Sequence, residues 1–228
     1  MLENSIALLS QPKLVIFDLD GTLVDSVPEI ALALDDTLRE LGLMPAGQDK
    51  TKGWVGNGLK TLLSRALSDQ SSSLDANPDA WYILLDAYER HINQQPSLFA
   101  GSKALLEGLQ SQGVKIALAT NKAQKFVPSI LEAQGILAYF DCVIGGDTLD
   151  EKKPHPKPLL HICETLSVAP SETWMIGDSP VDAHCAEAAG ITCILLEQGY
   201  NQGISLHSLP NHCVLPDMKS LSELYIHR

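Results

Sequence analysis

Short apolar runs and helical patterns alternate along most of the chain. The first run, Leu-Val-Ile-Phe at residues 14–17, is continuous and predicts a strand buried on both faces. Similar runs predict further strands, and apolar residues at helical spacing predict the helices between them. The expected strands are residues 114–119, 142–144, 173–176 and 192–196, and the expected helices are residues 102–112, 123–134, 158–166 and 181–189. This alternation requires crossover connections and therefore predicts an α/β fold with a parallel, doubly wound, Rossmann-like sheet.

Residues 25–95 follow a different pattern. Apolar residues recur there at helical spacing in three segments that begin near positions 28, 59 and 78, and no strand-like run separates them. Ser26 is a candidate N-cap of the first segment, Pro28 suits its first turn, and Gly42 is placed to end it. We therefore predict an α/β core formed by residues 1–24 and 96–228, with a helical cap of residues 25–95 inserted after the first strand.

Composition and charge narrow the possible partners. A hydrophobic content of 45% is enough for a sizeable core, and a net charge of -12 repels nucleic acid and anionic membranes at long range. The five cysteines lack C-x-x-C spacing and sit among apolar neighbours, which indicates reduced thiols rather than a zinc site. No apolar run is long enough to span a bilayer. We expect a cytoplasmic protein, a monomer or small homo-oligomer, that binds neither nucleic acid nor membrane.

Polar residues follow the predicted strands at the points where these end. In an open parallel sheet, ligands bind beyond the carboxyl ends of the strands, so these side chains are expected to converge. A proline-stiffened loop, K-K-P-H-P at residues 152–156, leads a lysine toward the same edge. The candidate site residues are Asp18, Asp20, Thr120, Asn121, Lys153, Asp178 and Asp182.

Paired carboxylates at the end of a buried strand raise each other's energy, so a cation or a reaction has to account for them. Asp18, Asp20 and Asp178 offer the hard oxygen ligands that Mg²⁺ favours. Lys153 supplies a compact positive charge, and Thr120, Asn121 and nearby backbone N–H groups are candidates to bind phosphoryl oxygens. Positioning and charge neutralisation of this kind are what phosphoryl transfer requires.

The two acids divide the expected chemistry between them. Asp18 is the candidate nucleophile, which would form an aspartyl phosphate and split the hydrolysis into two steps. Asp20 is the candidate acid and base, which would protonate the leaving alkoxide and then activate the attacking water. The substrate would be a small phosphorylated metabolite.

Several of these residues also have simpler structural interpretations. Asp18, Asp20 or Thr120 could cap the turn or helix that follows each of them. Asp182 could be an acid of a first helical turn. The site lysine could be Lys152 in place of Lys153. We place Lys122 and His155 at the periphery, and the cap residues Trp54 and Asn57 could serve either packing or substrate binding.

Four motifs in order along the chain resemble those of the haloacid dehalogenase superfamily. They are D-x-D-G-T at residues 18–22, a strand that ends in Thr120, the K-P-x-P loop at residues 153–156, and G-D-x-x-x-D at residues 177–182. The resemblance implies a magnesium-dependent phosphatase with a small helical cap between the first two motifs. It also favours Lys153 over Lys152, and it implies that Asp182 steadies the metal site from a second layer.

Further segments look like those of phosphoglycolate phosphatases. These are D-S-V-P at residues 25–28, G-W-V-G-N-G at residues 53–58, K-K-P-H-P-K-P-L from residue 152, and G-Y-N at residues 199–201. The expected activity is therefore hydrolysis of 2-phosphoglycolate to glycolate and phosphate. A sugar-phosphate phosphatase or phosphomutase is an alternative, because the cap selects the substrate. A phospho-accepting receiver domain is a rival from another class, although the inserted cap and the D-x-D-G-T order speak against it.

Overall fold

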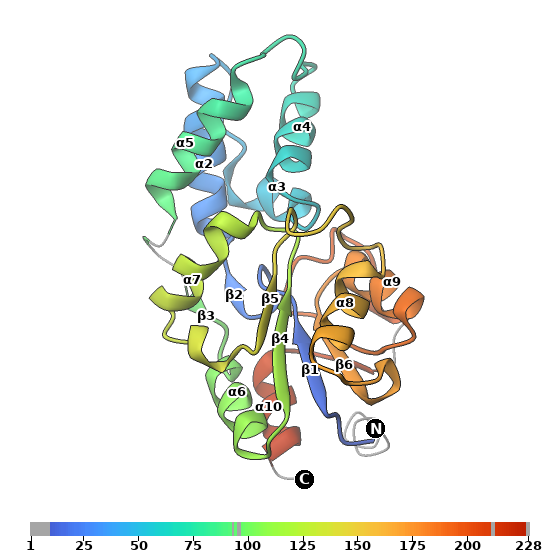
Figure 1. Ribbon diagram of the computed structural model, residues 1–228. Coiled ribbons are helices and arrows are strands. Elements are labelled where there is room, and N and C mark those ends of the chain that lie inside the picture. The colour runs from blue at the N-terminus through green and yellow to red at the C-terminus, as the bar shows by residue number, and fades with distance from the viewer. Residues whose placement is uncertain (1–9, 93, 95–96, 211–212, 227–228) are drawn as a thin grey trace.

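The computed structural model describes residues 10–92, 94, 97–210 and 213–226 of the chain. At its centre lies a six-stranded parallel sheet with the strand order β5-β4-β1-β6-β7-β8 (Figure 1). The predicted doubly wound α/β fold is confirmed, and the chain adds one edge strand that the apolar pattern did not predict. The strands are β1 (Leu14–Phe17), β4 (Lys115–Ala119), β5 (Cys142–Ile144), β6 (Thr173–Gly177), β7 (Thr192–Leu196) and β8 (Cys213–Leu215).

Helices cover both faces of this sheet (Figure 1). One face carries α6 (Ser102–Ser111), α7 (Val127–Ala133) and α10 (Met218–Ile226), and the other carries α8 (Lys157–Thr165) and α9 (Pro180–Ala189). Because successive strand residues point to opposite faces, Val15 and Phe17 pack with the first group of helices, and Leu14 and Ile16 pack with the second. Short 3-10 turns lie at Gln124–Phe126, Leu137–Tyr139, Pro170–Glu172 and Leu206–Ser208.

Four further helices form the upper end of the molecule in Figure 1. Helices α2 and α5 pack along each other, and α4 packs against α3 and α5. A two-stranded antiparallel sheet, in which Val24 pairs with Leu98, lies where the chain leaves the large sheet and returns to it. The elements are β2 (Val24–Asp25), α2 (Val27–Glu40), α3 (Gly47–Trp54), α4 (Leu59–Asp69), α5 (Ala80–His91) and β3 (Ser97–Leu98).

We refer to α2–α5 as the cap and to the large sheet with its helices as the core. The division at residues 1–24, 25–95 and 96–228 stays a prediction, and positions 95 and 96 lie outside the described residues. The three helices expected in this region are present as α2, α4 and α5, and Gly42, with φ +71°, follows the end of α2 as expected.

Two helices have no counterpart among the sequence predictions. Helix α3 buries only Thr51, so its sequence carries no apolar stripe from which a helix could be recognised. Helix α10 follows the last strand and packs against α6, with the Tyr225 ring edge-on to Trp174 at 6.2 Å between centroids. The single helix expected at 123–134 is instead a 3-10 turn followed by α7, with Pro128 in the first turn of α7.

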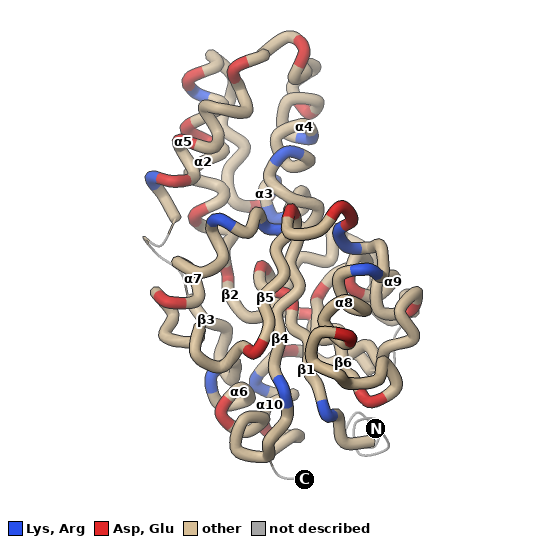
Figure 2. Tube along the Cα trace, in the orientation of Figure 1, with Lys and Arg blue, Asp and Glu red and all other residues tan. Residues whose placement is uncertain are grey.

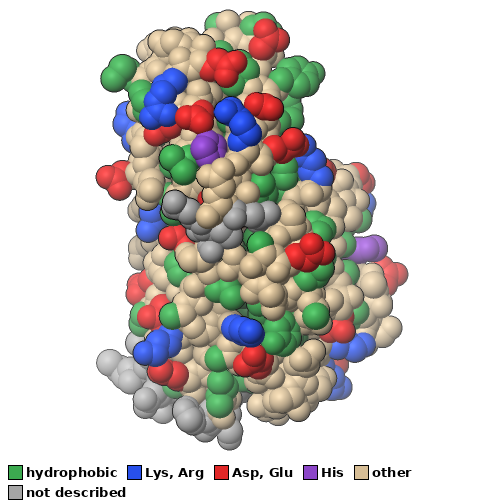
Figure 3. Space-filling view, turned by 90° about the vertical axis from the view of Figure 1, so that its left-hand side faces the viewer, with side chains coloured by type: hydrophobic (Ala, Val, Ile, Leu, Met, Phe, Trp, Pro, Cys, Tyr) green, Lys and Arg blue, Asp and Glu red, His purple; other side chains and the backbone are tan. Residues whose placement is uncertain are grey.

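The distribution of charged residues and the state of the cysteines agree with what the composition indicated. Acidic positions are spread over cap and core (Figure 2), and on the face in Figure 3 side chains of both signs alternate over the cap. All five cysteines are free thiols, four of them buried, as the absence of pairing motifs indicated. Within the described ranges, every helix falls short of the length and apolar character that crossing a bilayer demands.

Candidate active site

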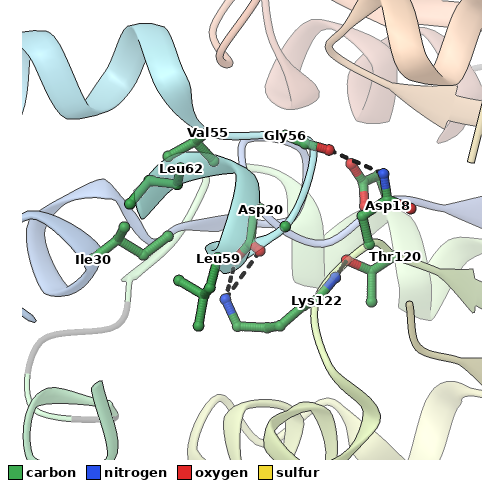
Figure 4. Close-up of a pocket in the computed structure, with 11 residues that line it drawn as sticks. Asp18, Asp20, Ile30, Val55, Gly56, Leu59, Leu62, Thr120 and Lys122 are labelled. Carbon is green, nitrogen blue, oxygen red and sulfur yellow. Dashed lines mark hydrogen bonds and ion pairs between the residues drawn. The ribbon is translucent and has the colours of Figure 1, made fainter. Parts of the chain in front are cut away.

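The predicted polar residues meet beneath the cap, at the carboxyl ends of β1, β4 and β6. Strand β1 lies between β4 and β6 in the sheet, so residues that follow the three strands become neighbours. The residues that follow β1 and β4 form the floor of a small pocket, and apolar side chains and glycines of the cap form its roof (Figure 4). The pocket is lined by Asp18, Asp20, Thr120, Asn121 and Lys122 of the core and by Ile30, Val55, Gly56, Gly58, Leu59 and Leu62 of the cap.

Lys153 is buried between two carboxylates of this site. Its Nζ lies 3.0 Å from Asp18 Oδ1 and 2.6 Å from Asp182 Oδ1. Burial alone would lower the pKa of Lys153, but Asp18 and Asp182 outweigh burial and hold that pKa above its ordinary value. The structure therefore places a protonated Lys153 against Asp18, whereas Lys152 is exposed and donates to the carbonyl oxygen of Asn57 at 3.0 Å.

Asp182 has the two structural roles that its position allows. Its Oδ2 accepts the Ser179 hydroxyl at 2.6 Å and the Ser179 backbone N–H at 3.2 Å, which forms a capping box at the start of α9. Its Oδ1 accepts a hydrogen bond from the Lys153 ammonium group. One carboxylate thus caps α9 and binds Lys153, and the role expected of Asp182 behind a metal site stays a prediction.

Asp178 is buried next to Asp18 at the end of β6. Its Oδ1 accepts the hydroxyl of Thr22 at 2.7 Å, and its Oδ2 accepts the backbone N–H of Tyr200 at 2.6 Å. Gly21 makes this approach possible, because a Cβ there would lie 2.3 Å from Asp178 Oδ2 and the backbone has φ +89°. Burial, together with the Asp182 and Asp18 carboxylates, raises the pKa of Asp178 well above its ordinary value.

Asp18, Asp178 and Asp182 form a cluster that fits a divalent cation. One oxygen from each lies within 4.8 Å of the others, and Lys153 is the ammonium that faces the cluster. Burial raises the pKa of Asp18 to about 7, against the opposing Lys153 charge and with reinforcement from Asp182. A hard cation bound next to these carboxylate oxygens would lower their pKa values again.

Asp20 lies outside this cluster. Both of its carboxylate oxygens bind Lys122, whose Nζ lies 2.7 Å from Oδ1 and 2.9 Å from Oδ2. The metal-binding role expected of Asp20 therefore stays a prediction, and its side chain is positioned toward the pocket and the cap (Figure 4). Among the described residues, the acidic group whose oxygens lie close enough together to hold one cation consists of Asp18, Asp178 and Asp182.

Lys122 is the site residue that sequence reasoning missed. We expected it at the periphery, but its side chain is 2% exposed and lines the pocket. Its Nζ also lies 5.2 Å from the ring centroid of Tyr88, on cap helix α5. Burial alone would lower the pKa of Lys122, yet Asp20 outweighs burial and raises it, so the amine is protonated. The sequence offered one signal for this role, because Lys122 directly follows Thr120 and Asn121, which were expected at the site.

Thr120 and Asn121 lie where the strand-end rule put them. The Thr120 side chain is buried and its Oγ1 accepts the backbone N–H of Lys122 at 3.2 Å, which leaves its own hydroxyl proton available to a ligand. The Asn121 side-chain amide donates to the carbonyl oxygens of Gly56 at 3.1 Å and Lys153 at 3.0 Å. Asn121 thereby ties the cap to the Lys153 loop, and its role in substrate binding stays a prediction.

The glycine-rich cap loop at residues 53–58 is held down by side chains of the core. Gln202 Nε2 donates to the carbonyl oxygen of Val55 at 2.9 Å and to Asn57 Oδ1 at 3.2 Å. Asn57 Oδ1 also accepts from Arg65 at 2.9 Å, so its side chain organises the loop, whereas Trp54 does not line the pocket. The pocket beneath this loop is small, with a cavity volume of about 30 Å³, and it is partly open to solvent.

Comparison with known proteins agrees with this geometry. Residues 15–196 match the family of haloacid dehalogenase-like hydrolases. The chain is 38% identical over 223 residues to a phosphoglycolate phosphatase of Nitrosococcus oceani, covering 95% of this chain and 98% of that protein. It is 40% identical over 215 residues to that of Pseudomonas putida, covering 92% and 78%. The crystal structure of a predicted phosphoglycolate phosphatase from Haemophilus somnus is similar, with a TM-score of 0.89, 32% identity and coverage of 94% and 98%.

Proposed function

This chain belongs to the haloacid dehalogenase-like hydrolase family and is a phosphoric monoester hydrolase, and we propose that it hydrolyses 2-phosphoglycolate to glycolate and inorganic phosphate. The observation that carries this proposal is Asp18, held at 3.0 Å from a buried Lys153 on the floor of a pocket closed by the cap. The similarity to phosphoglycolate phosphatases over nearly the whole chain supports the choice of substrate.

We propose that the reaction proceeds in two steps. In the first, a carboxylate oxygen of Asp18 attacks phosphorus while the bond from phosphorus to the glycolate oxygen breaks, and Asp20 gives its proton to that oxygen. In the second, Asp20 takes a proton from water, which attacks the aspartyl phosphate and releases phosphate and free Asp18. Lys153 neutralises charge on the phosphoryl oxygens, and the Thr120 hydroxyl donates to one of them.

A divalent cation, for which we propose Mg²⁺, fits between Asp18 and Asp178. When bound there it would neutralise negative charge on the phosphoryl group. Asp182 would support the site indirectly, because it holds Lys153 and caps α9. The observation that supports a metal here is the group of three buried carboxylates with oxygens within 4.8 Å of one another, two of which, Asp18 and Asp178, have elevated pKa values.

Motion of the cap is part of this proposal. The pocket lies between the cap and the core and is small, so movement of the cap away from the core would widen the entrance for a phosphate ester. Closure then excludes bulk water, which protects the aspartyl phosphate and strengthens the electrostatic contacts around the phosphoryl group. The apolar roof formed by cap residues Val55, Leu59 and Leu62 suits that purpose.

The compartment and assembly are proposals as well. We propose that the enzyme acts in the cytoplasm on a small phosphorylated metabolite, as a monomer or small homo-oligomer that binds neither nucleic acid nor membrane. Five free thiols suit a reducing compartment, and a net charge of -12 disfavours polyanionic partners.

A phosphate-release panel with Mg²⁺ tests the substrate. We expect the highest kcat/KM for 2-phosphoglycolate among esters that include hexose phosphates and nucleoside monophosphates. A higher value for a sugar phosphate would replace the proposed substrate with the sugar-phosphate alternative. Isomerisation of a sugar phosphate without net phosphate release would identify a phosphomutase.

The variant Asp18→Asn tests the nucleophile. It keeps the size of the side chain but removes the attacking oxygen anion, so we expect kcat to fall roughly 10³-fold or more. Thermal melting should still show a folded protein. Asp86→Asn, at a carboxylate that is 76% exposed on α5, is the matched control and should retain full activity. Turnover by Asp18→Asn close to that of the unmodified enzyme would rule out the proposed mechanism.

A further inference from the structure

The pocket has two chemically different ends. The phosphoryl end consists of Asp18 and Thr120, with Lys153 bound to Asp18 from behind. The end beneath the cap is walled by the aliphatic side chains of Ile30, Val55, Leu59 and Leu62. Among the described residues that line the pocket, Lys122 is the one cationic side chain, and Figure 4 shows it beside Asp20 near this apolar wall.

The environment of Lys122 leaves it able to bind a further anion. Its ammonium group has three protons, and within the described part of the chain its hydrogen-bond acceptors are the two oxygens of one carboxylate, Asp20. The Tyr88 ring centroid lies 5.2 Å from the ammonium nitrogen. The buried Tyr88 hydroxyl also interacts with the ammonium group and helps to raise the pKa of Lys122, but within the described residues it forms no hydrogen bond of good geometry. A second carboxylate at this position would be stabilised by a desolvated, permanently charged donor.

The proposed substrate brings such a carboxylate to this place. In 2-phosphoglycolate a single methylene group separates the leaving oxygen from the carboxylate carbon. Asp20 is the group proposed to protonate the leaving oxygen, and Lys122 is bound to Asp20 at 2.7 Å. The substrate carboxylate therefore falls within reach of Lys122. Without a cation there, burying this carboxylate against the aliphatic side chains of the cap would carry a large desolvation cost.

We propose that Lys122 binds the carboxylate of the substrate and thereby selects phosphate esters whose leaving group carries a carboxylate next to the ester oxygen. This inference rests on the proposed function and adds the residue that determines specificity. By holding Asp20 and the substrate carboxylate on one ammonium group, Lys122 also aligns the leaving oxygen with its proton donor. Lys122 lies on the core, so it can bind the substrate before the cap has closed.

The test compares two esters of matched length in the full chain with Mg²⁺. They are 2-phosphoglycolate and 2-hydroxyethyl phosphate, which has a hydroxymethyl group in place of the carboxylate. The quantity measured is the ratio of their kcat/KM values, because loss of folded protein or of Asp20 function changes both values together and cancels. We expect a ratio well above one for the unmodified enzyme and a decrease of at least about tenfold for Lys122→Met.

Three further variants separate charge recognition from a structural effect. Lys122→Arg keeps the charge and should recover part of the ratio. Lys122→Gln keeps hydrogen-bond donors for Asp20 without the charge, should behave like Lys122→Met, and serves in its place if the methionine variant does not fold. Lys125→Met is the matched control, since Lys125 lies in the same segment but is exposed and paired with Glu89 at 2.6 Å. It should leave the ratio unchanged.

Failure of this inference and failure of the proposed function give different results. If the unmodified enzyme prefers 2-phosphoglycolate and both uncharged Lys122 variants keep the same ratio, Lys122 is structural and the inference is overturned while the substrate stands. If the unmodified enzyme does not distinguish the two esters, or prefers a sugar phosphate, the proposed substrate is wrong and the inference is overturned with it.

Discussion

At the scale of single residues, the site is dominated by carboxylates that are costly to ionise. Asp18 and Asp178 are both buried, and Asp182 adds a third carboxylate within 4.8 Å. Burial raises the pKa of Asp18 to about 7 and that of Asp178 well above its ordinary value, although Lys153 opposes the shift at Asp18. A second positive charge beside Lys153 would therefore favour the ionised form of Asp18 that the proposed mechanism requires.

The pH dependence of metal stabilisation follows from these two carboxylates. Asp18 titrates near 3.8 in the unfolded chain and near 7 in the metal-free native state, so its contribution to stability is complete below about pH 4 and is lost as the pH rises through about 7. Mg²⁺ bound at the proposed site would take the place of these protons. We therefore expect the rise in Tm caused by Mg²⁺ to be small near about pH 5 and larger near about pH 8, by thermal melting with and without chelator.

Asp178→Asn provides the check on this interpretation. The amide removes one charged ligand, so the rise in Tm caused by Mg²⁺ should become small at both pH values. Magnesium shifts of equal size at the two pH values in the unmodified protein would contradict the assignment of these carboxylates as metal ligands.

At the scale of elements, Tyr200 joins the start of the cap to the acidic cluster. Its hydroxyl donates to Asp25 Oδ1 at 2.5 Å and accepts the backbone N–H groups of Ser26 at 3.0 Å and Val27 at 3.2 Å. Its own backbone N–H donates to Asp178. The first N–H groups of a helix lack intrahelical acceptors, and Ser26, at the N-cap position we expected, makes no capping hydrogen bond. Tyr200 takes over that task for α2.

Tyr200→Phe should therefore destabilise the protein. The ring is retained, but buried N–H groups at the start of α2 lose their acceptor, which costs about 1–3 kcal/mol. Urea denaturation followed by circular dichroism measures the loss. Tyr82→Phe is the matched control, because Tyr82 is 70% exposed on α5, and it should change the free energy of unfolding by less than about 0.5 kcal/mol. Equal midpoints for the two variants would show that the Tyr200 hydroxyl is not a helix cap.

At the scale of the whole molecule, three core side chains tie the glycine-rich cap loop to the core. Asn121, Lys152 and Gln202 donate to the backbone carbonyl oxygens of Gly56, Asn57 and Val55, which are consecutive in the cap loop. These donors come from loops after β4, before α8 and after β7. Because water can replace each contact, each of them stabilises this cap position only modestly, which agrees with the cap motion proposed above.

Removing one of these contacts should shift the cap toward its open position. Gln202→Ala deletes the donor to Val55, and we expect the closed state to lose stability by a factor of about 2 to 10. Faster hydrogen exchange at residues 53–62 would report this change. Lys60→Ala, at an exposed position of α4, is the control and should exchange at the unmodified rate. Unchanged exchange in Gln202→Ala would mean that the contact does not contribute to closure.

Much of this architecture can be predicted from the sequence because the signals are local. The alternation of strand-like runs with helical spacing predicts five of the strands by itself, since apolar periodicity reports burial directly. The strand-end rule then places Asp18, Thr120 and Asp178 at one edge. By contrast, α3 buries a single residue and carries no apolar stripe, and β2 and β3 are two-residue strands that exist only as a pair.

The sequence by itself determined the α/β class, through the alternation of strand-like runs and helical spacing. Through short motifs at strand ends, it also placed Asp18, Thr120 and Asp178 at one edge of the sheet. Only the tertiary structure decided that Lys122 binds Asp20, 102 residues away in the chain, and that Tyr200 caps α2 from 174 residues beyond Ser26. An exposed lysine and a buried one look alike in a sequence. What distinguishes them is the partner that folding brings within hydrogen-bonding distance.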